Sequence, residues 1–180
     1  MTVEALRRRR PQTLADLLDT HGREIQAVAY LILRDRLAAE DVTIETLLTA
    51  FEKGGSIRDE HSVRAWLLKV ATNKALALRR SGARLVDLEL VAEHAAPGDL
   101  AGEAASHIAL LAGVADLPPA MRAAVVLRYY SDLPVEEVAA ALGKSPNTIK
   151  AQLQTALDRL RRSLADPAAD ATAPREARHA

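Results

Sequence analysis

Apolar residues recur every three or four positions along most of the chain, the spacing that places side chains on one face of a helix. The N-terminal part shows this pattern three times, over residues 13–33, 38–53 and 63–81. A break is predicted inside the first segment, near His21 and Gly22. Three amphipathic helices with short connections predict one small bundle.

Four further helices are predicted in the C-terminal part, over residues 105–115, 119–130, 134–142 and 146–164. Each of the last three begins with a proline, which the first helical turn tolerates because its amide has no partner there. We therefore predict an all-α fold with two small helical domains joined by a linker.

The predicted domain boundaries lie where this pattern stops. Residues 82–107 have weak periodicity and turn-forming residues, so they are predicted to be a linker. Residues 1–12 and 165–180 lack an apolar stripe and are predicted to be a flexible N-terminus and a disordered tail. The two domains are then residues 13–81 and 108–164.

Composition narrows the class of protein. The chain has one Trp, one Phe and three Tyr, so its cores must be built from aliphatic contacts between helices. It has no cysteine, which excludes disulfides and thiolate chemistry and fits a reducing compartment. No apolar run approaches the roughly 18 residues that span a bilayer. We expect no membrane insertion and a cytoplasmic protein.

Residues 134–150 have the pattern of a helix-turn-helix. Gly143 permits a positive φ in the turn, and Ser145 can cap the following helix by accepting a bond from a backbone amide. Any helical hairpin with a glycine turn shares part of this pattern, but the added cap makes that alternative weaker. The residues expected to close its core are Val135, Val138, Leu142, Ile149 and Leu153.

The second helix of this unit carries polar side chains on its outer stripe and edges. In a major groove, Asn and Gln can read adenine edges, while Lys and Arg can bond to guanine or phosphate. The predicted DNA-binding residues are Ser145, Asn147, Thr148, Lys150, Ala151, Gln152, Gln154 and Arg159.

The charge pattern predicts a DNA reader that needs a partner. Residues 1–81 carry 14 basic and 11 acidic side chains, and residues 105–165 carry 7 and 5. Between them, residues 82–104 carry 1 basic and 5 acidic side chains. Such small positive excesses give weak binding to a polyanion, because affinity depends on the number of phosphates neutralised.

Two sets of motifs resemble one known family. Residues 117–130, the helix-turn-helix and the segment LDRLR at residues 157–161 together resemble region 4 of the extracytoplasmic-function (ECF) sigma factors. Upstream, AEDV at residues 39–42 and RAWLLKVATN at residues 64–73 resemble region 2 of the same family. The resemblance implies a non-catalytic protein that binds core RNA polymerase and directs transcription from promoter DNA.

The resemblance also implies roles for residues of the first domain. The helix with Asp41, Glu45 and Leu48 would pack on the largest polymerase subunit, although a solvated acidic face is the plainer alternative. A loop over residues 56–62 would hold a flipped base of the minus-ten element, since extrusion of a base needs a pocket. The residues implied to contact the minus-ten element are Arg58, His61, Ser62, Asn73, Lys74, Arg79 and Arg80.

Several positions depart from the family pattern. Ile44 replaces the usual Gln, and Leu47 replaces the favoured Phe, so contacts with polymerase are expected to be altered. Thr72 and Gln152 each stand where Arg is common, so an atypical promoter preference is expected. Trp66 matches the family, but at helical spacing it is expected in the core rather than against a base.

Two other classes of protein remain as alternatives. A stand-alone helix-turn-helix regulator would bind its operator without polymerase. An enzyme is opposed by the absence of a Gly-rich phosphate loop, a nucleophile motif and a histidine cluster with metal-ligand spacing. We therefore predict no catalytic residue, no metal and no cofactor. An anti-sigma factor is left open as a further partner.

Overall fold

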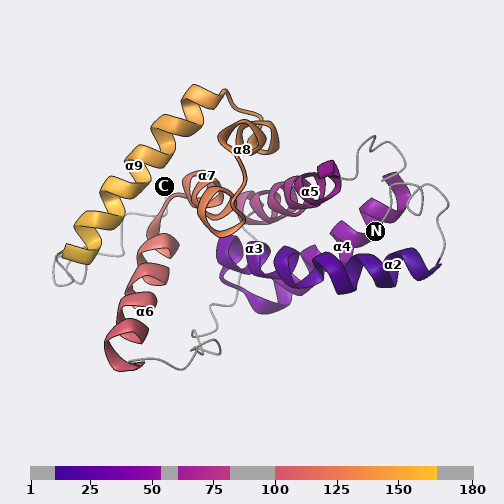
Figure 1. The fold of residues 1–180 in the computed structure, drawn as a ribbon, viewed down its shortest axis with the longest axis horizontal. Coiled ribbons are helices and arrows are strands. Elements are labelled where there is room, and N and C mark those ends of the chain that lie inside the picture. The colour runs from indigo at the N-terminus through magenta and orange to yellow at the C-terminus, as the bar shows by residue number, and fades with distance from the viewer. Residues whose placement is uncertain (1–10, 54–60, 82–99, 166–180) are drawn as a thin grey trace.

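The computed structural model describes residues 11–53, 61–81 and 100–165, and every regular element within them is helical. The predicted all-α class is confirmed. Two groups of helices pack side by side, the N-terminal group in indigo to magenta and the C-terminal group in salmon to yellow (Figure 1). Most of the predicted linker, loop, N-terminus and tail lies outside the described residues.

A helix predicted to break near Gly22 instead continues through it. Gly22 has φ −57° and ψ −45°, which is ordinary helical backbone. A π-helical turn over Leu18–Gly22 joins α2 to α3 without interruption, so the predicted break was wrong. The N-terminal group consists of α2 (Pro11–Leu17), the π-helix η1 (Leu18–Gly22), α3 (Arg23–Leu33), α4 (Arg36–Lys53) and α5 (His61–Arg80).

The connection between α3 and α4 is tight. Arg34 adopts a left-handed conformation with φ 62°, and its amide donates to the carbonyl of Tyr30. The Oδ1 atom of Asp35 then accepts the amide of Ala38 at 2.9 Å, which caps the next helix. This cap explains why α4 begins at Arg36, two residues before the predicted start.

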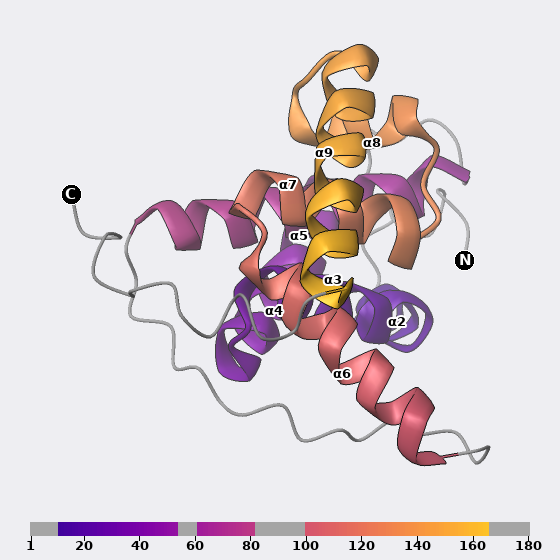
Figure 2. The ribbon, with the colours of Figure 1, turned by 90° about the vertical axis from the view of Figure 1, so that its left-hand side faces the viewer.

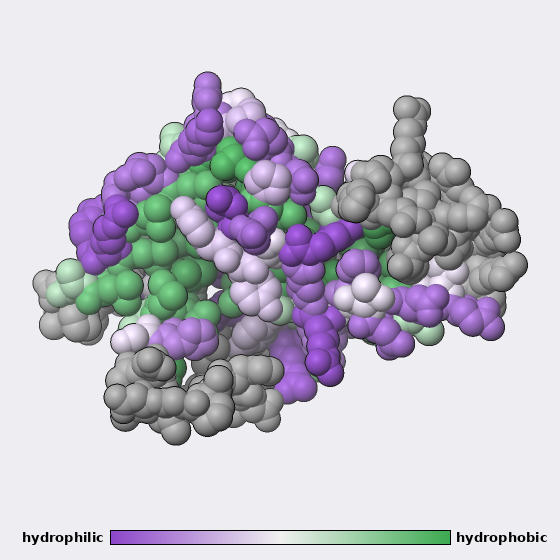
Figure 3. Space-filling view, in the orientation of Figure 1, coloured by the Kyte–Doolittle hydropathy of each residue, from purple (hydrophilic) through white to green (hydrophobic). Residues whose placement is uncertain are grey.

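In the C-terminal group, α6 begins five residues earlier than predicted and extends into the predicted linker. Its N-terminal half projects from the molecule (Figure 2), and Ile108 and Leu110 on it are exposed. Figure 3 shows hydrophobic surface gathered over the part built by α6, α7 and α9. The group consists of α6 (Leu100–Asp116), α7 (Pro119–Val125), the π-helix η3 (Val126–Tyr130), α8 (Val135–Leu142) and α9 (Pro146–Ala165).

Each group buries aliphatic side chains, as the lack of aromatic residues predicted, and the two groups also pack against each other. The helix α5 lies against α8, and α3 lies against α7 and η3. The two predicted bundles are therefore in direct contact rather than held only by the linker. Fully buried residues are Val28, Ile32, Val42, Leu67 and Ala71 in the first bundle, and Leu127, Val138, Ile149 and Ala156 in the second.

Candidate nucleic-acid and polymerase interfaces

The turn between α8 and α9 has the geometry that its sequence predicted. Gly143 adopts φ 63° and ψ 38°, and its amide donates to the carbonyl of Ala139. A Cβ atom added there would meet nothing within 4 Å, so backbone strain alone selects glycine. The Oγ atom of Ser145 accepts the amide of Thr148 at 3.1 Å and caps α9. The predicted helix-turn-helix is thus confirmed in its geometry.

The outer face of α9 exposes most of the predicted DNA-binding residues. On the opposite side of the helix, Ile149 and Leu153 are buried, which fixes the rotation of α9 about its axis. Gln152 is the exception, because it is half-buried and its Oε1 atom is buried without a hydrogen-bond partner among the described residues. The exposed members of the predicted set are Ser145, Asn147, Thr148, Lys150, Ala151, Gln154 and Arg159.

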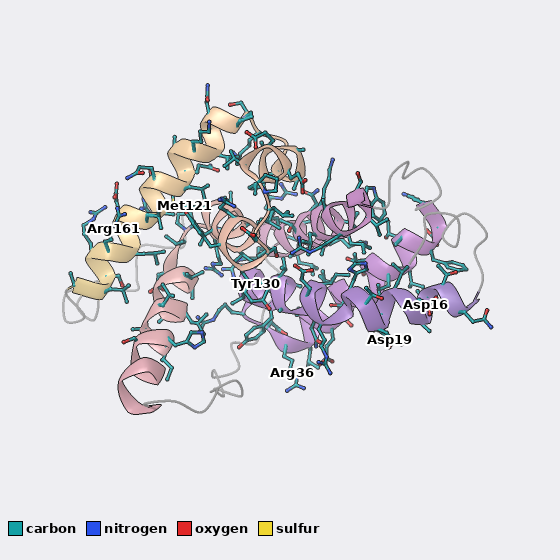
Figure 4. All side chains as sticks on the ribbon, viewed as in Figure 1. Asp16, Asp19, Arg36, Met121, Tyr130 and Arg161 are labelled. Atoms are coloured by element: carbon teal, nitrogen blue, oxygen red, sulfur yellow. The ribbon has the colours of Figure 1, made fainter. Side chains whose placement is uncertain are left out.

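An acidic residue marks the end of this face. Asp158 accepts a hydrogen bond from Gln154 Nε2 at 3.4 Å, and its Oδ1 atom lies 2.8 Å from Nη1 of Arg161. Arg161 lies on the side of α9 that faces away from the rest of the molecule (Figure 4). Asp158 is the first acidic residue of α9, so the first two turns of the helix carry no carboxylate that would repel a phosphate.

Three of the residues predicted to contact the minus-ten element are held by other parts of the protein. Asn73 Nδ2 donates to the carbonyl of Ala141 in α8 at 3.3 Å. Lys74 Nζ pairs with Glu45 Oε2 at 2.8 Å. Arg79 Nη1 donates to two carbonyls at the end of α3, at 3.2 and 3.4 Å. The surface of α5 that was expected to face DNA is therefore partly engaged within the chain.

The other predicted minus-ten residues lie at the two ends of α5. Ser62 is exposed in the first turn, and Arg80 is exposed in the last. His61 begins the helix, so His61 and Ser62 were wrongly predicted to belong to a loop. The side chain of His61 and the whole of Arg58 lie outside the described residues.

One side of α4 combines acidic and aliphatic side chains. Leu37 is 64% exposed, Ile44 57% and Leu48 47%, which is unusual for large aliphatic residues. Asp41 and Glu45 are also exposed. Residues 37, 41, 44 and 48 follow helical spacing and form one stripe. Exposed aliphatic residues in a stripe favour a protein contact over a merely solvated acidic face.

Two arginines, Arg64 and Arg122, link the two bundles. The sequence alone assigned neither of them a role. Arg64 donates to the Glu24 carboxylate from Nε at 2.9 Å and to the Ser131 carbonyl from Nη2 at 2.6 Å. Arg122 is buried and donates from Nη1 to the carbonyl of Ile32 at 2.8 Å, besides bonds within its own bundle. Backbone carbonyls carry no side-chain signature, so no pattern in the sequence predicts these contacts.

Titratable groups gather around Glu24 at this junction, where Tyr130 also lies (Figure 4). The hydrogen bond with Glu24 raises the pKa of Arg64, although burial opposes it. Burial raises the pKa of the Tyr130 hydroxyl, and the Glu24 charge adds to this effect. Burial lowers the pKa of His21, against the attraction of Glu24. The junction therefore favours a charged Arg64, a neutral tyrosine and a neutral histidine.

A shallow apolar cavity of about 180 Å³ lies between α5 and α8. Trp66 is half-buried there and packs on the core, so the expected core position holds only in part. The cavity places this side chain at the contact between the two bundles. Its lining residues are Ser62, Ala65, Trp66, Lys69, Glu137, Ala140 and Ala141.

The part of the chain that the structure describes offers neither a cluster of metal ligands nor a helix that could span a membrane. There, no group of three or more His, Cys, Asp or Glu side chains could hold a metal ion. None of the helices in these segments is long and apolar enough to cross a membrane.

Two segments of the chain match known protein families. Residues 17–85 match the description "Sigma-70 region 2", and residues 107–160 match "Sigma-70, region 4". The two matches coincide with the two helical bundles and occur in the order that the motifs predicted.

Relatives of similar length match most of the chain. The RNA polymerase sigma-E factor of Streptomyces coelicolor is 34% identical over 143 residues, which cover 79% of this chain and 80% of that protein. The ECF RNA polymerase sigma factor SigL of Mycobacterium tuberculosis is 31% identical over 155 residues, covering 82% and 86%. Among solved structures, the sigma factor RpoE of Bartonella quintana, in complex with the anti-sigma factor NepR, matches with a TM-score of 0.66 and 25% identity, covering 84% of this chain and 96% of that one.

Proposed function

The chain belongs to the ECF family of RNA polymerase sigma factors, and we propose that its two bundles divide the recognition of a promoter between them. As a sigma factor, it binds core RNA polymerase and directs promoter-specific initiation of transcription. This function is favoured over a stand-alone regulator. Sigma factors are initiation factors rather than enzymes, so no residue is assigned a catalytic role. Its proposed place of action is the cytoplasm, together with polymerase.

In this proposal, residues 108–164 read the minus-thirty-five element with the first two turns of α9. The observation that carries it is the exposure of Asn147 and Lys150 on the side opposite the buried Ile149, just after the capped turn. An amide and an ammonium at these positions can bond to base edges and phosphates in a major groove. Ala151 leaves room for a base or its methyl group.

Residues 13–81 would bind and open the minus-ten element along α5. Lys74 and Arg80 supply cations for phosphates, and Asn73 and Ser62 supply polar groups for bases. By resemblance to the family, Arg58 and His61 would complete this surface. Extrusion of a base is costly, so a rigid helix beside the pocket favours it.

The stripe on α4 would bind polymerase. Leu37, Ile44 and Leu48 offer apolar area, and Asp41 offers a charge that can pair with a cationic partner surface. Association gains most from well-packed residues that lose water near the centre of a contact, and charges mainly set its specificity and rate. Ile44 replaces the usual family Gln, which makes this stripe more apolar than expected.

An anti-sigma factor is proposed as a second protein partner. The likeness to RpoE, whose solved structure contains the anti-sigma factor NepR, supports this partner but does not identify it. The exposed apolar side chains on α4 and α6 are surfaces that such a protein could cover.

Transcription from genomic DNA tests the proposed function. Core RNA polymerase from the source organism is combined with the chain, and the RNA ends are sequenced to identify promoters. We expect a discrete set of start sites that share two upstream elements and are absent with core polymerase alone. Specific binding to DNA without polymerase, together with no new start sites, would instead support the stand-alone regulator.

A further inference from the structure

We propose that the turn between α3 and α4 binds the DNA backbone through Arg34, beside the end of α5. The inference rests on the proposed function, because that function assigns α5 to the minus-ten element. It adds a contact from a different element, with the phosphates of the duplex that flanks the minus-ten element. Arg34, Arg79 and Arg80 together form this arginine surface.

Arg34 adopts a backbone conformation that favours glycine. Its φ is 62° and its ψ is 26°, and among the described residues with a side chain only Asp132 also has a positive φ. Glycine is the usual residue where a helix ends in this left-handed conformation, because a Cβ atom is strained there. Strain of this kind persists where the surrounding structure holds it, and it gathers at functional sites. The arginine at this position therefore points to a function of its side chain.

The end of α3 does not need the charge of Arg34. Arg79 Nη1 donates to the carbonyls of Ile32 and Leu33 at 3.4 and 3.2 Å. Arg122 Nη1 also donates to the Ile32 carbonyl, at 2.8 Å. The last carbonyls of a helix carry partial negative charge, which these two guanidinium groups already offset. Capping of α3 therefore does not explain why an arginine follows it.

The surroundings of the turn are positively charged. Arg80 is exposed in the last turn of α5. The first two carboxylates that follow the turn in the chain are both engaged, since Asp35 is buried and caps α4, and Glu40 pairs with Arg36 at 3.3 Å. Arg36 points away from the rest of the molecule (Figure 4). Such a surface suits an anion, and promoter DNA is the polyanion that the proposed function brings to the adjoining helix.

The position of the arginine surface selects the part of the DNA that it meets. In the proposed function, the opened bases lie at the start of α5, and Arg80 lies at the opposite end. The helix has 20 residues and is therefore about 30 Å long, which spans several base pairs at about 3.4 Å each. The arginine surface thus faces the backbone of the flanking duplex. Contacts with phosphates position a protein on DNA and carry no sequence information.

Replacement of Arg34 by glycine separates a role in DNA binding from a structural role. Glycine relieves the strain of the left-handed backbone, so Arg34→Gly should unfold at an equal or higher denaturant concentration than the wild type. Holoenzyme with this variant should nevertheless bind promoter DNA more weakly, and its slope of log K against log salt should be shallower by about 0.9. Arg34→Lys keeps the cation and should keep the wild-type slope.

Arg23→Gln is the matched control, because it removes the same charge from the exposed start of α3. Arg23 lies 11 residues before Arg34, which is about 16 Å along a helix. Holoenzyme with Arg23→Gln should keep the wild-type affinity and slope. If Arg34→Gly lowers stability but leaves the slope unchanged, Arg34 is structural and the proposal is overturned.

Neutral backbone linkages identify the DNA that the surface contacts. Promoter duplexes are made with single methylphosphonate linkages, which lack the charged oxygen, at successive positions of the flank. One of these positions should weaken binding of wild-type holoenzyme as much as Arg34→Gly does. Combined with Arg34→Gly, that linkage should cause no further loss, because both changes remove one contact. Additive losses at every position would overturn the contact.

Failure of this inference can be distinguished from failure of the proposed function. If wild-type holoenzyme initiates at discrete promoters but Arg34→Gly binds them with the wild-type slope, only the role of Arg34 is wrong. If Arg34→Gly fails to bind core polymerase in the absence of DNA, the turn is a protein contact and the inference is also wrong. If polymerase with the wild-type chain initiates nowhere, the proposed function is wrong, and the inference fails with it.

Discussion

Lys74 Nζ lies 2.8 Å from Glu45 Oε2, so the helix assigned to promoter DNA is bonded to the helix assigned to polymerase. The Glu45 side chain is 62% exposed, and ion pairs at such surfaces contribute at most about 1 kcal/mol. A DNA phosphate can therefore take the place of Glu45 beside Lys74, and a cation of the polymerase can take the place of Lys74 beside Glu45. It follows that substitution of Glu45 alters both proposed surfaces, whereas substitution of Asp41 alters one.

Removal of the Glu45 carboxylate should strengthen the salt dependence of promoter binding. In Glu45→Gln, Lys74 becomes available to a phosphate, so the slope of log K against log salt for preassembled holoenzyme should steepen by up to about 0.9. Lys74→Ala should make the slope shallower. Asp41→Asn removes the same charge from the same face of α4 and is the control with an unchanged slope. Identical slopes for all the variants would show that the Glu45–Lys74 pair does not affect the binding of DNA phosphates.

Truncation of Asn147 or Lys150 to alanine should weaken recognition of the minus-thirty-five element. Each loss is expected to be about 1–3 kcal/mol if the side chain bonds to a base edge. Holoenzyme binding is measured on promoters with an intact or a scrambled upstream element, and the loss should appear only on the intact one. Arg161→Ala is the control, because Asp158 holds Arg161 beyond the first two turns of α9. An equal loss on both promoters would mean that these residues do not read sequence.

The turn of the helix-turn-helix should be sensitive at two of its three positions. Gly143→Ala forces a Cβ atom into a backbone with φ 63° and should lower the free energy of unfolding by about 1–2 kcal/mol. Ser145→Ala removes the cap of α9 and should lower it by about 1 kcal/mol. Lys144→Ala, at the exposed position between them, should have little effect. Denaturant titrations compare the three, and equal stability of all would contradict the role of the turn.

Acidification should destabilise the protein in part through His21. Burial lowers the pKa of His21, so the folded state favours its neutral form. Its contribution to stability is therefore present above the unfolded pKa of about 6.5 and is lost as the pH falls through the lower folded value. In His21→Gln, the unfolding free energy should fall less steeply below about pH 6.5. His107→Gln, on the exposed part of α6, should keep the wild-type profile.

Local chemistry made much of the fold predictable from the sequence. Gly143 and Ser145 act through their own backbone and immediate neighbours, so the turn and the start of α9 follow from residue type alone. The same holds for the rotation of α9, because Ile149 and Leu153 repeat at helical spacing on one side. The assignment of the exposed residues of α9 to DNA binding stays a prediction that rests on their exposure and on family resemblance.

Features that depend on tertiary packing were not predictable in this way. Gly22 predicted a break in the first helix. The helix instead continues, because residues 18–22 form a π-helical turn with helical backbone at Gly22. The contacts of Arg64 and Arg122 with distant carbonyls depend on how the bundles dock, and an arginine on a helix is ordinarily solvated. Asn73 was predicted to face DNA, yet in the structure it bonds to α8. Sequence patterns describe each bundle better than the contact between bundles.

Co-purification with core RNA polymerase tests the central claim most directly. The wild-type chain is compared with an Asp41→Arg, Leu48→Asp double variant. This variant changes the stripe on α4 and keeps both residues of the Glu45–Lys74 pair. Arg36→Asp, at the exposed start of the same helix and outside the stripe, is the control for charge reversal on α4. We predict that the wild type and the control bind polymerase and that the folded double variant does not. A wild-type chain that fails to bind core polymerase would contradict the account.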